Sequence, residues 1–75
     1  MHIDKTVDTS GLTCPLPVLR VKQALKAMDS AQVLHVIATD PGAWSDLEAY
    51  CRQSGHRLLE RRRTEGLLLF WLEKA

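Results

Sequence analysis

The segment Thr9–Pro17, which reads TSGLTCPLP, is where the chain changes from an extended pattern to a helical one. Pro15 fits the first helical position, because proline lacks an N–H and that position offers no intrahelical acceptor for one. Pro17 still lies among the first helical residues, whose N–H groups are unpaired. Apolar residues then recur at helical spacing through the following turns. We therefore predict a helix over Pro15–Met28, with Cys14 at its N-cap.

Four strands and a second helix are expected around this segment. Apolar and β-branched residues predict strands over Ile3–Asp8, Gln32–Thr39, His56–Arg63 and Leu67–Glu73. The second helix begins either at Asp40-Pro41, as cap and first position, or at Ser45, where Ser45-x-x-Glu48 matches a capping box. Gly55 is expected to end that helix, and Thr64-Glu65-Gly66 to form a tight turn between the last two strands.

The resulting order, β-α-β-α-β-β, predicts the fold class α/β, as a two-layer sandwich. A helix that links two strands usually leaves them parallel, whereas the last two strands are close enough to form an antiparallel hairpin. We expect one mixed four-stranded sheet with both helices on one face. A chain of 75 residues buries only roughly 60% of its unfolded surface. We therefore expect a single domain over residues 1–75.

Composition excludes several classes of protein. The net charge is +1, so the total charge demands neither nucleic acid nor an anionic membrane. Two cysteines are too few for a disulfide-rich secreted scaffold. Residues 1–5 lack the pattern of a signal peptide, and the apolar run Leu67–Leu72 is too short to span a bilayer. We expect a cytoplasmic protein that does not contact a membrane, and its thiols are expected to stay reduced.

The stretch Gly11-Leu12-x-Cys14-Pro15-Leu16-Pro17, placed between a strand and a helix, resembles the CPxP motif of the TusA/SirA-like sulfur carrier family. Three further pairs of residues are similar to that family, and the resemblance covers nearly the whole chain. These pairs are Asp40-Pro41, Asp46-Leu47 and Gly55-His56. The resemblance implies a single TusA-like domain that carries sulfane sulfur as a persulfide on Cys14.

The resemblance also implies a sulfurtransferase in the broad sense, a stoichiometric carrier that needs no cofactor. The implied partners are a cysteine desulfurase or a rhodanese-like enzyme as sulfur donor and a second protein as acceptor. The relay ends in 2-thiouridine of tRNA in the best known pathway, and in sulfur oxidation, molybdenum cofactor synthesis or selenium metabolism in others. The motif is common to all of these pathways and does not indicate which of them this chain serves.

The chemistry of Cys14 can also be argued from the residues. Sulfur exchange needs an accessible thiol that is partly ionised near neutral pH. A helix N-terminus favours an anion, but Pro15 and Pro17 remove N–H donors there. We therefore predict that the main effect of the two prolines is to position the sulfur, and that acidification of the thiol is their secondary effect. Two alternatives remain, a regulatory or adaptor domain in which Cys14 carries nothing, and a thiol redox protein that uses Cys14 and Cys51.

The other candidate ligands and nucleophiles favour structural roles. Cys51 shares a helical face with Leu47, which favours a place in the core over a second, resolving thiol. Cys14, Cys51, His2, His35 and His56 show no close zinc-like spacing, so we expect no metal site. His35 is expected to be a half-exposed residue of the sheet.

Two surfaces could meet partners. The run Arg61-Arg62-Arg63 is either a solvated strand end or a docking patch for an acidic surface. Direct binding of nucleic acid is disfavoured, because no aromatic residue alternates with these arginines in the sequence. The last strand is apolar throughout, so either Leu68, Phe70 and Leu72 or the alternate set should face away from the helices. We expect a monomer or a weak homodimer that pairs through this sheet face, unless neighbouring strands cover it.

Overall fold

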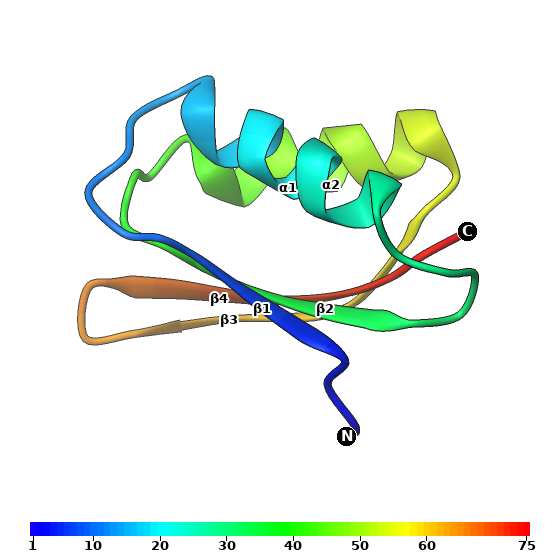
Figure 1. The fold of residues 1–75 in the computed structure, drawn as a ribbon. Coiled ribbons are helices and arrows are strands. Elements are labelled where there is room, and N and C mark those ends of the chain that lie inside the picture. Colours follow the sequence, from blue (N-terminus) through cyan, green and yellow to red (C-terminus); the bar gives the residue numbers. More distant parts are fainter.

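The structure is a computed structural model that describes residues 1–75. The two helices lie side by side on one face of a four-stranded sheet, which leaves the other face open (Figure 1). The elements are β1 (Lys5–Thr9), α1 (Leu16–Lys26), β2 (Val33–Ala38), α2 (Ala43–Ser54), β3 (Arg57–Thr64) and β4 (Leu67–Glu73). The predicted α/β two-layer sandwich and the order β-α-β-α-β-β are confirmed. Neither helix has the length and apolar content that a membrane crossing requires.

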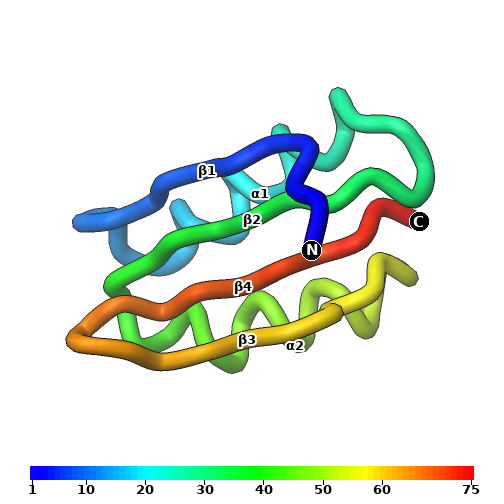
Figure 2. The backbone as a smooth tube through the Cα atoms, turned by 90° about the horizontal axis from the view of Figure 1, so that it is seen from below, coloured from blue at the N-terminus to red at the C-terminus, as the bar shows by residue number.

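The strands lie in the order β1-β2-β4-β3 (Figure 2). β1 and β2 are parallel, and β4 is antiparallel to both of its neighbours, β2 and β3. The mixed sheet and the hairpin are therefore as predicted. Glu65 and Gly66 in the hairpin turn both have positive φ, 49° and 80°, as a two-residue hairpin turn of the favoured hand requires. The place of β4 between β2 and β3 was not part of the prediction.

β1 and β2 differ from the predicted strands at both ends, because they span Lys5–Thr9 rather than Ile3–Asp8 and Val33–Ala38 rather than Gln32–Thr39. β1 begins at Lys5 rather than Ile3, because the Asp4 carboxylate accepts a hydrogen bond from the N–H of Val33 at 2.8 Å. β2 ends at Ala38 rather than Thr39, whose hydroxyl oxygen accepts a hydrogen bond from the N–H of Gly11 in the loop after β1. β3 runs one residue later than predicted at both ends, and β4 has the predicted bounds.

The second helix begins later than the first predicted start and before the second. Its first residue is Ala43, and Gly42 takes the N-cap position without a side-chain cap. The carbonyl of Asp40 accepts from the N–H of Ala43 at 3.0 Å, and that of Pro41 from Trp44 at 3.3 Å. These three-residue turns occupy the segment where the helix was expected to start. The predicted stop at Gly55 is confirmed, in the left-handed conformation with φ of 86°.

The core lies between the helices and the sheet. Phe70 of β4 is fully buried at its centre, with Leu25 of α1, Leu47 of α2 and Leu34 of β2 around it. Leu68, Phe70 and Leu72 thus face the helices, and the alternate residues of β4 face the open side. Burying residues of this size contributes roughly 1.5–3 kcal/mol each. The core therefore fixes which face of β4 remains open.

The open face of the sheet carries half-buried apolar side chains. Trp71 of β4 stacks on the ring of His35 of β2, with 4.6 Å between ring centroids. Leu69 and Ile37 are partners in the register of the same two strands. His35 also contacts the carbonyl of Phe70 through Nδ1 at 2.9 Å, which confirms it as a half-exposed residue of the sheet.

Candidate functional site

Two loops meet at one edge of the sheet and hold the residues of the site. Because β1 and β2 are parallel, the loops that follow them leave from the same edge, the usual place for a site in an α/β sheet. Residues 10–15 connect β1 to α1, and residues 39–42 connect β2 to α2 (Figure 1). The N–H of Gly11 donates to the Thr39 hydroxyl oxygen at 2.8 Å, which joins the two loops. Gly11 has a φ of 80°, a conformation that favours glycine.

Cys14 lies exposed on the first of these loops. It precedes the helix by one residue more than predicted, because Pro15 is the N-cap. The carbonyl of Pro15 accepts the first helical hydrogen bond, from the N–H of Leu19 at 3.2 Å. The N–H of Leu16 instead donates back to Thr13 at 2.9 Å, so that Cys14 sits inside a turn. The predicted N-cap position of Cys14 is therefore wrong, while its exposure agrees with a reactive thiol.

The two prolines on either side of Leu16 have different environments. Pro17 is fully buried and belongs to the first turn of α1, where its missing N–H has no helical acceptor. Pro15 is exposed and is joined to Cys14 by a cis peptide bond. The burial of Pro17 attaches the thiol-bearing turn to the core.

Two carboxylates lie next to the Cys14 thiol. They belong to Asp46 of α2 and to Asp40 of the loop before it. The Asp46 carboxylate, partial desolvation of the thiol and the negative charge of Asp40 raise the pKa of Cys14 above its ordinary value. Sulfur exchange requires partial ionisation of the thiol near neutral pH, and the two carboxylates, from the second loop and from α2, act against it.

Asp40 and Asp46 were missed as site residues by sequence reasoning. Gly42 lies between them, and a Cβ built on it would be 3.0 Å from the Asp40 carboxylate and 3.5 Å from that of Asp46. A signal was available, because parallel β1 and β2 place the residue after β2 and the first turn of α2 beside Cys14. The sequence separation of 32 residues between Cys14 and Asp46 concealed it.

Cys51 has the opposite environment from Cys14. It is 3% exposed, lies in the core beside Leu47, and its burial raises its pKa to about 11. The predicted core role is confirmed. Both cysteines are free, and a buried, protonated Cys51 is a poor partner for Cys14 in redox chemistry. No group of three or more His, Cys, Asp or Glu side chains is arranged to hold a metal ion.

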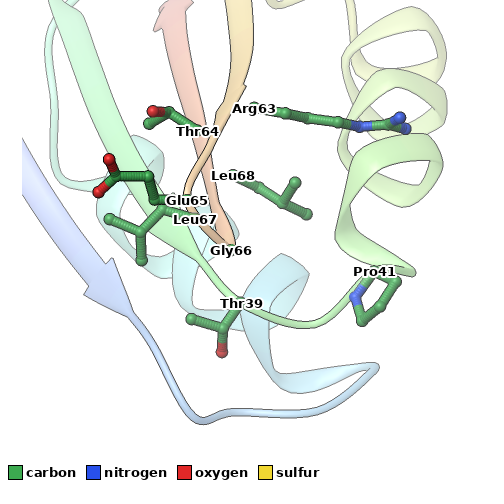
Figure 3. Close-up of a pocket in the computed structure, with 8 residues that line it drawn as sticks. All are labelled: Thr39, Pro41, Arg63, Thr64, Glu65, Gly66, Leu67 and Leu68. Atoms are coloured by element: carbon green, nitrogen blue, oxygen red, sulfur yellow. The ribbon is translucent and has the colours of Figure 1, made fainter.

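A hollow of about 570 Å³ lies on the other side of the second loop (Figure 3). Its walls come from Thr39 and Pro41 of that loop and from the β3–β4 hairpin, residues 63–68. The side chain of Leu68 points into the space between the hairpin and α2. The hollow therefore adjoins the loop that carries Asp40.

Two of the three consecutive arginines pack against α2. The guanidinium carbons of Arg61 and Arg63 lie 4.2 Å and 4.1 Å from the centroid of the Trp44 ring. Arg61 also donates to the Trp44 carbonyl at 3.0 Å and lies 3.5 Å from the Glu48 carboxylate. Arg61 is thus half-buried and engaged within the chain, whereas Arg63 remains exposed above the same ring.

Arg62 points to the open face. It pairs with Glu60 and lies over the Trp71 ring at 5.5 Å. Aromatic rings therefore do accompany the arginine run, contrary to the sequence reasoning, because Trp44 and Trp71 come from other elements. At least one arginine of this chain already lies over each of these two rings.

Together, the exposed thiol and the two-layer sheet define a small α/β domain that presents one cysteine at the sheet edge. The sequence model of the family "Sulfurtransferase TusA" matches residues 5–74. A sulfur carrier protein TusA of Allochromatium vinosum is 50% identical over 72 residues, or 96% of this chain and 95% of that protein. A putative sulfur carrier protein of Bacillus subtilis, YrkI, is 45% identical over the full length of both chains. The chain therefore belongs to the TusA sulfurtransferase family, and it is a sulfur carrier.

A solved structure shares the fold. The crystal structure of a SirA-like protein from Desulfitobacterium hafniense superposes with a TM-score of 0.80 at 24% identity. The match covers 92% of this chain and 95% of the other. It supports the architecture described above.

Proposed function

We propose that Cys14 accepts a sulfur atom from a donor protein, holds it as a persulfide and passes it to an acceptor protein. The observation that carries the proposal is the exposure of Cys14 on the loop between β1 and α1, within the CPxP motif. Cys51, the only other cysteine, is in the core and cannot reach a partner without unfolding. A single exposed thiol is sufficient for a carrier.

The transfer is a thiol exchange without net oxidation. The sulfur of Cys14 attacks the terminal sulfur of the donor persulfide, and the bond between the two donor sulfurs breaks. The electron pair leaves with the donor sulfur, which takes up the proton that Cys14 gives up. The products are the Cys14 persulfide and the donor thiol, and delivery runs the same exchange onto an acceptor thiol. This exchange needs no cofactor.

Pro15 and Pro17 act by positioning the sulfur. Because the pKa of Cys14 is raised, the free chain does not acidify its thiol, so the motif must contribute otherwise. A turn with fixed φ at both prolines, anchored by the buried Pro17, presents Cys14 in one orientation. A rigid presentation reduces the ordering cost of docking.

The donor and the acceptor meet the protein at the edge that carries Cys14. Leu16 and Leu19, on the first turn of α1, are 40% and 43% exposed and provide apolar surface next to the thiol. A cysteine desulfurase or a rhodanese-like enzyme is the proposed donor. The acceptor belongs to a tRNA 2-thiolation relay or to another sulfur-trafficking pathway. We propose that the relay operates in the cytoplasm, where exposed thiols stay reduced.

The test is the intact mass of the protein after incubation with a cysteine desulfurase and cysteine, or with a rhodanese and thiosulfate. We expect the wild-type chain to gain one sulfur atom that reduction removes. Cys14→Ser should gain none, and Cys51→Ala, the matched control, should gain as much as the wild type. Absence of any gain, with Cys14 reduced and open to alkylation, would favour the adaptor role instead.

A further inference from the structure

The hollow beside the second loop lies at the same edge of the sheet as the loop that carries Cys14. One row of residue partners crosses all four strands at this edge: Thr9 of β1, Ala38 of β2, Leu68 of β4 and Arg63 of β3. The row spans three strand spacings, which is about 15 Å. A typical protein interface covers about 800 Å² on each partner, so a protein docked at Cys14 is wide enough to reach the hollow as well.

One wall of the hollow is attached to the loop of Cys14. Thr39 lines the hollow, and its hydroxyl oxygen accepts a hydrogen bond from the N–H of Gly11 at 2.8 Å. Pro41 continues the same wall and is exposed. A partner that fills the hollow therefore touches a loop that is bonded directly to the loop bearing the thiol.

Arg63 supplies a positive charge to the hollow. Its guanidinium carbon lies 4.1 Å from the centroid of the Trp44 ring, and its side chain extends from the hairpin toward α2 (Figure 3). Glu65, which also lines the hollow, extends from the opposite side of the hairpin in the same view. The ion pairs and hydrogen bonds of guanidinium groups involve other arginines, namely Arg57, Arg61 and Arg62. The charge of Arg63 is therefore left unpaired.

The Trp44 ring prepares Arg63 to bind an anion. A cation over an aromatic ring is attracted by the ring face, and this contact uses none of the guanidinium N–H donors as hydrogen bonds to oxygen. The planar guanidinium group can thus form two parallel hydrogen bonds with one carboxylate. Because the ring already restricts the side chain, less conformational entropy is lost when the anion binds.

The rest of the hollow is suited to an apolar group. The side chain of Leu68 points into the space between the hairpin and α2 (Figure 3). Leu67 is 38% exposed at the rim. Sites of this kind combine apolar walls with a few polar groups that fix the orientation of the ligand. The matching ligand has a carboxylate beside an apolar side chain, as a short acidic segment of a protein does.

The charges favour such a protein segment over a nucleic acid. A phosphate backbone binds through several free cations along its length. Arg61 and Arg62, however, already pair with Glu48 and Glu60. Arg63 is the only one of the three consecutive arginines without an ion pair, and one free guanidinium group matches one carboxylate.

We infer that the hollow is a docking site for an acidic residue of the sulfur donor, whose carboxylate pairs with Arg63 while a neighbouring apolar side chain lies against Leu68. The inference rests on the proposed function, and it adds a contact that the donor makes away from the reacting sulfur atoms. The contact strengthens docking and takes no part in the exchange of sulfur.

The experiment measures the initial rate of sulfur transfer to Cys14 against the concentration of the carrier. The donor is a cysteine desulfurase with cysteine or a rhodanese with thiosulfate, whichever loads Cys14. We expect Arg63→Gln to raise KM about threefold or more, because a charged contact is lost, and to leave kcat unchanged. Arg52 is an exposed arginine in the last turn of α2, and Arg52→Gln, the matched control, should behave as the wild type.

Two further variants test the chemistry of the contact. Arg63→Glu should raise KM about tenfold or more, because two carboxylates repel each other. Arg63→Lys should give an intermediate KM, because it keeps the charge and loses the planar pair of donors. The difference between Arg63→Gln and the wild type should shrink at high salt, which screens exposed charges. Protection of Cys51 from iodoacetamide in each variant shows that the fold is intact.

The outcomes separate the inference from the proposed function. If neither enzyme loads Cys14, the proposed function fails and the inference fails with it. If Cys14 loads and neither Arg63→Gln nor Arg63→Glu changes KM, docking at the hollow is overturned and the carrier function stands. The same holds if Arg63→Gln weakens only the binding of tRNA, measured in parallel, or lowers kcat at constant KM.

Discussion

At the scale of single residues, Pro17 joins the chemistry of the site to the stability of the fold. Its ring is fully buried beneath the turn that presents Cys14, and its φ is fixed at the start of α1. Removing the ring leaves a small cavity in the folded protein and increases the conformational entropy of the unfolded chain. Both effects act on the orientation of the thiol rather than on its charge.

We predict that Pro17→Ala lowers the rate of sulfur transfer to Cys14 more than it lowers the thiolate fraction. The free energy of unfolding should fall by about 1–2 kcal/mol, from the lost methylene burial and the added chain entropy. Transfer is measured by intact mass over time, thiolate by its ultraviolet absorbance, and stability by urea titration. Leu19→Ala, on the exposed side of the same turn, is the control for stability. A matched fall in transfer rate and thiolate fraction would show that acidification matters as much as position.

The sequence predicts which cysteine is exposed but not the direction of its pKa shift. Cys14 lies among turn residues and Cys51 lies on an apolar helical face, and these are local patterns. The effect of Asp46 on Cys14 arises because the parallel strands β1 and β2 bring the loop after β1 and the start of α2 to the same edge of the sheet, which local patterns do not contain. For the same reason Trp44 could not be assigned to a pair of arginines from β3.

At the scale of elements, the C-terminal end of α1 is capped by a side chain from beyond β4. The amine of Lys74 donates to the carbonyl of Leu25 at 2.5 Å and to that of Met28 at 3.1 Å. These carbonyls lie in the last turn of α1 and just beyond it, where the regular helical pairing of carbonyl groups ends, and that of Leu25 also accepts from the N–H of Met28 at 3.0 Å. A cation at this position also opposes the negative end of the helix dipole.

We predict that Lys74→Met lowers the free energy of unfolding by about 1–3 kcal/mol, as expected for the loss of charge-assisted hydrogen bonds. Lys5→Met, an exposed lysine on β1, should change stability by less than about 0.5 kcal/mol. Both values come from urea titration followed by far-ultraviolet circular dichroism. Equal stability of the two variants would mean that the Lys74 contacts contribute nothing in solution.

Element boundaries were predictable where the local pattern is complete. β4 has the predicted bounds because a continuous apolar run lies between a turn and a charged residue. The first residues of α1 and α2, Leu16 and Ala43, differ from the predicted ones. The reason is that their N–H groups donate to the carbonyls of Thr13 and Asp40 in the turns before each helix. The position of β4 within the sheet follows from long-range pairing, which element order alone does not determine.

At the scale of the whole molecule, the sheet has one face covered by both helices and one face open. The open face presents Leu69 and Trp71 of β4, flanked by the pair Glu60 and Arg62. Leu68 and Phe70, by contrast, are in the core, so that replacing them would unfold the protein rather than test the surface.

We predict that the protein is a monomer, or a weak dimer paired through this open face. Sedimentation equilibrium across a wide concentration range measures the association, and the double variant Leu69→Ser/Trp71→Ser should abolish it because apolar burial is its driving force. Leu19→Ser, which changes an exposed leucine on α1, is the matched control and should not alter it. An association that survives in the double variant would place the contact elsewhere.

The position of β4 between β2 and β3 has a consequence for how the protein is made. When β3 has been synthesised, the two strands that will flank β4 have nothing between them to pair with. The fully buried Phe70, which supplies the centre of the core, is also still missing at that stage. Folding must therefore wait until β4 has left the ribosome, and the nascent chain up to Thr64 is the form that most needs protection from aggregation.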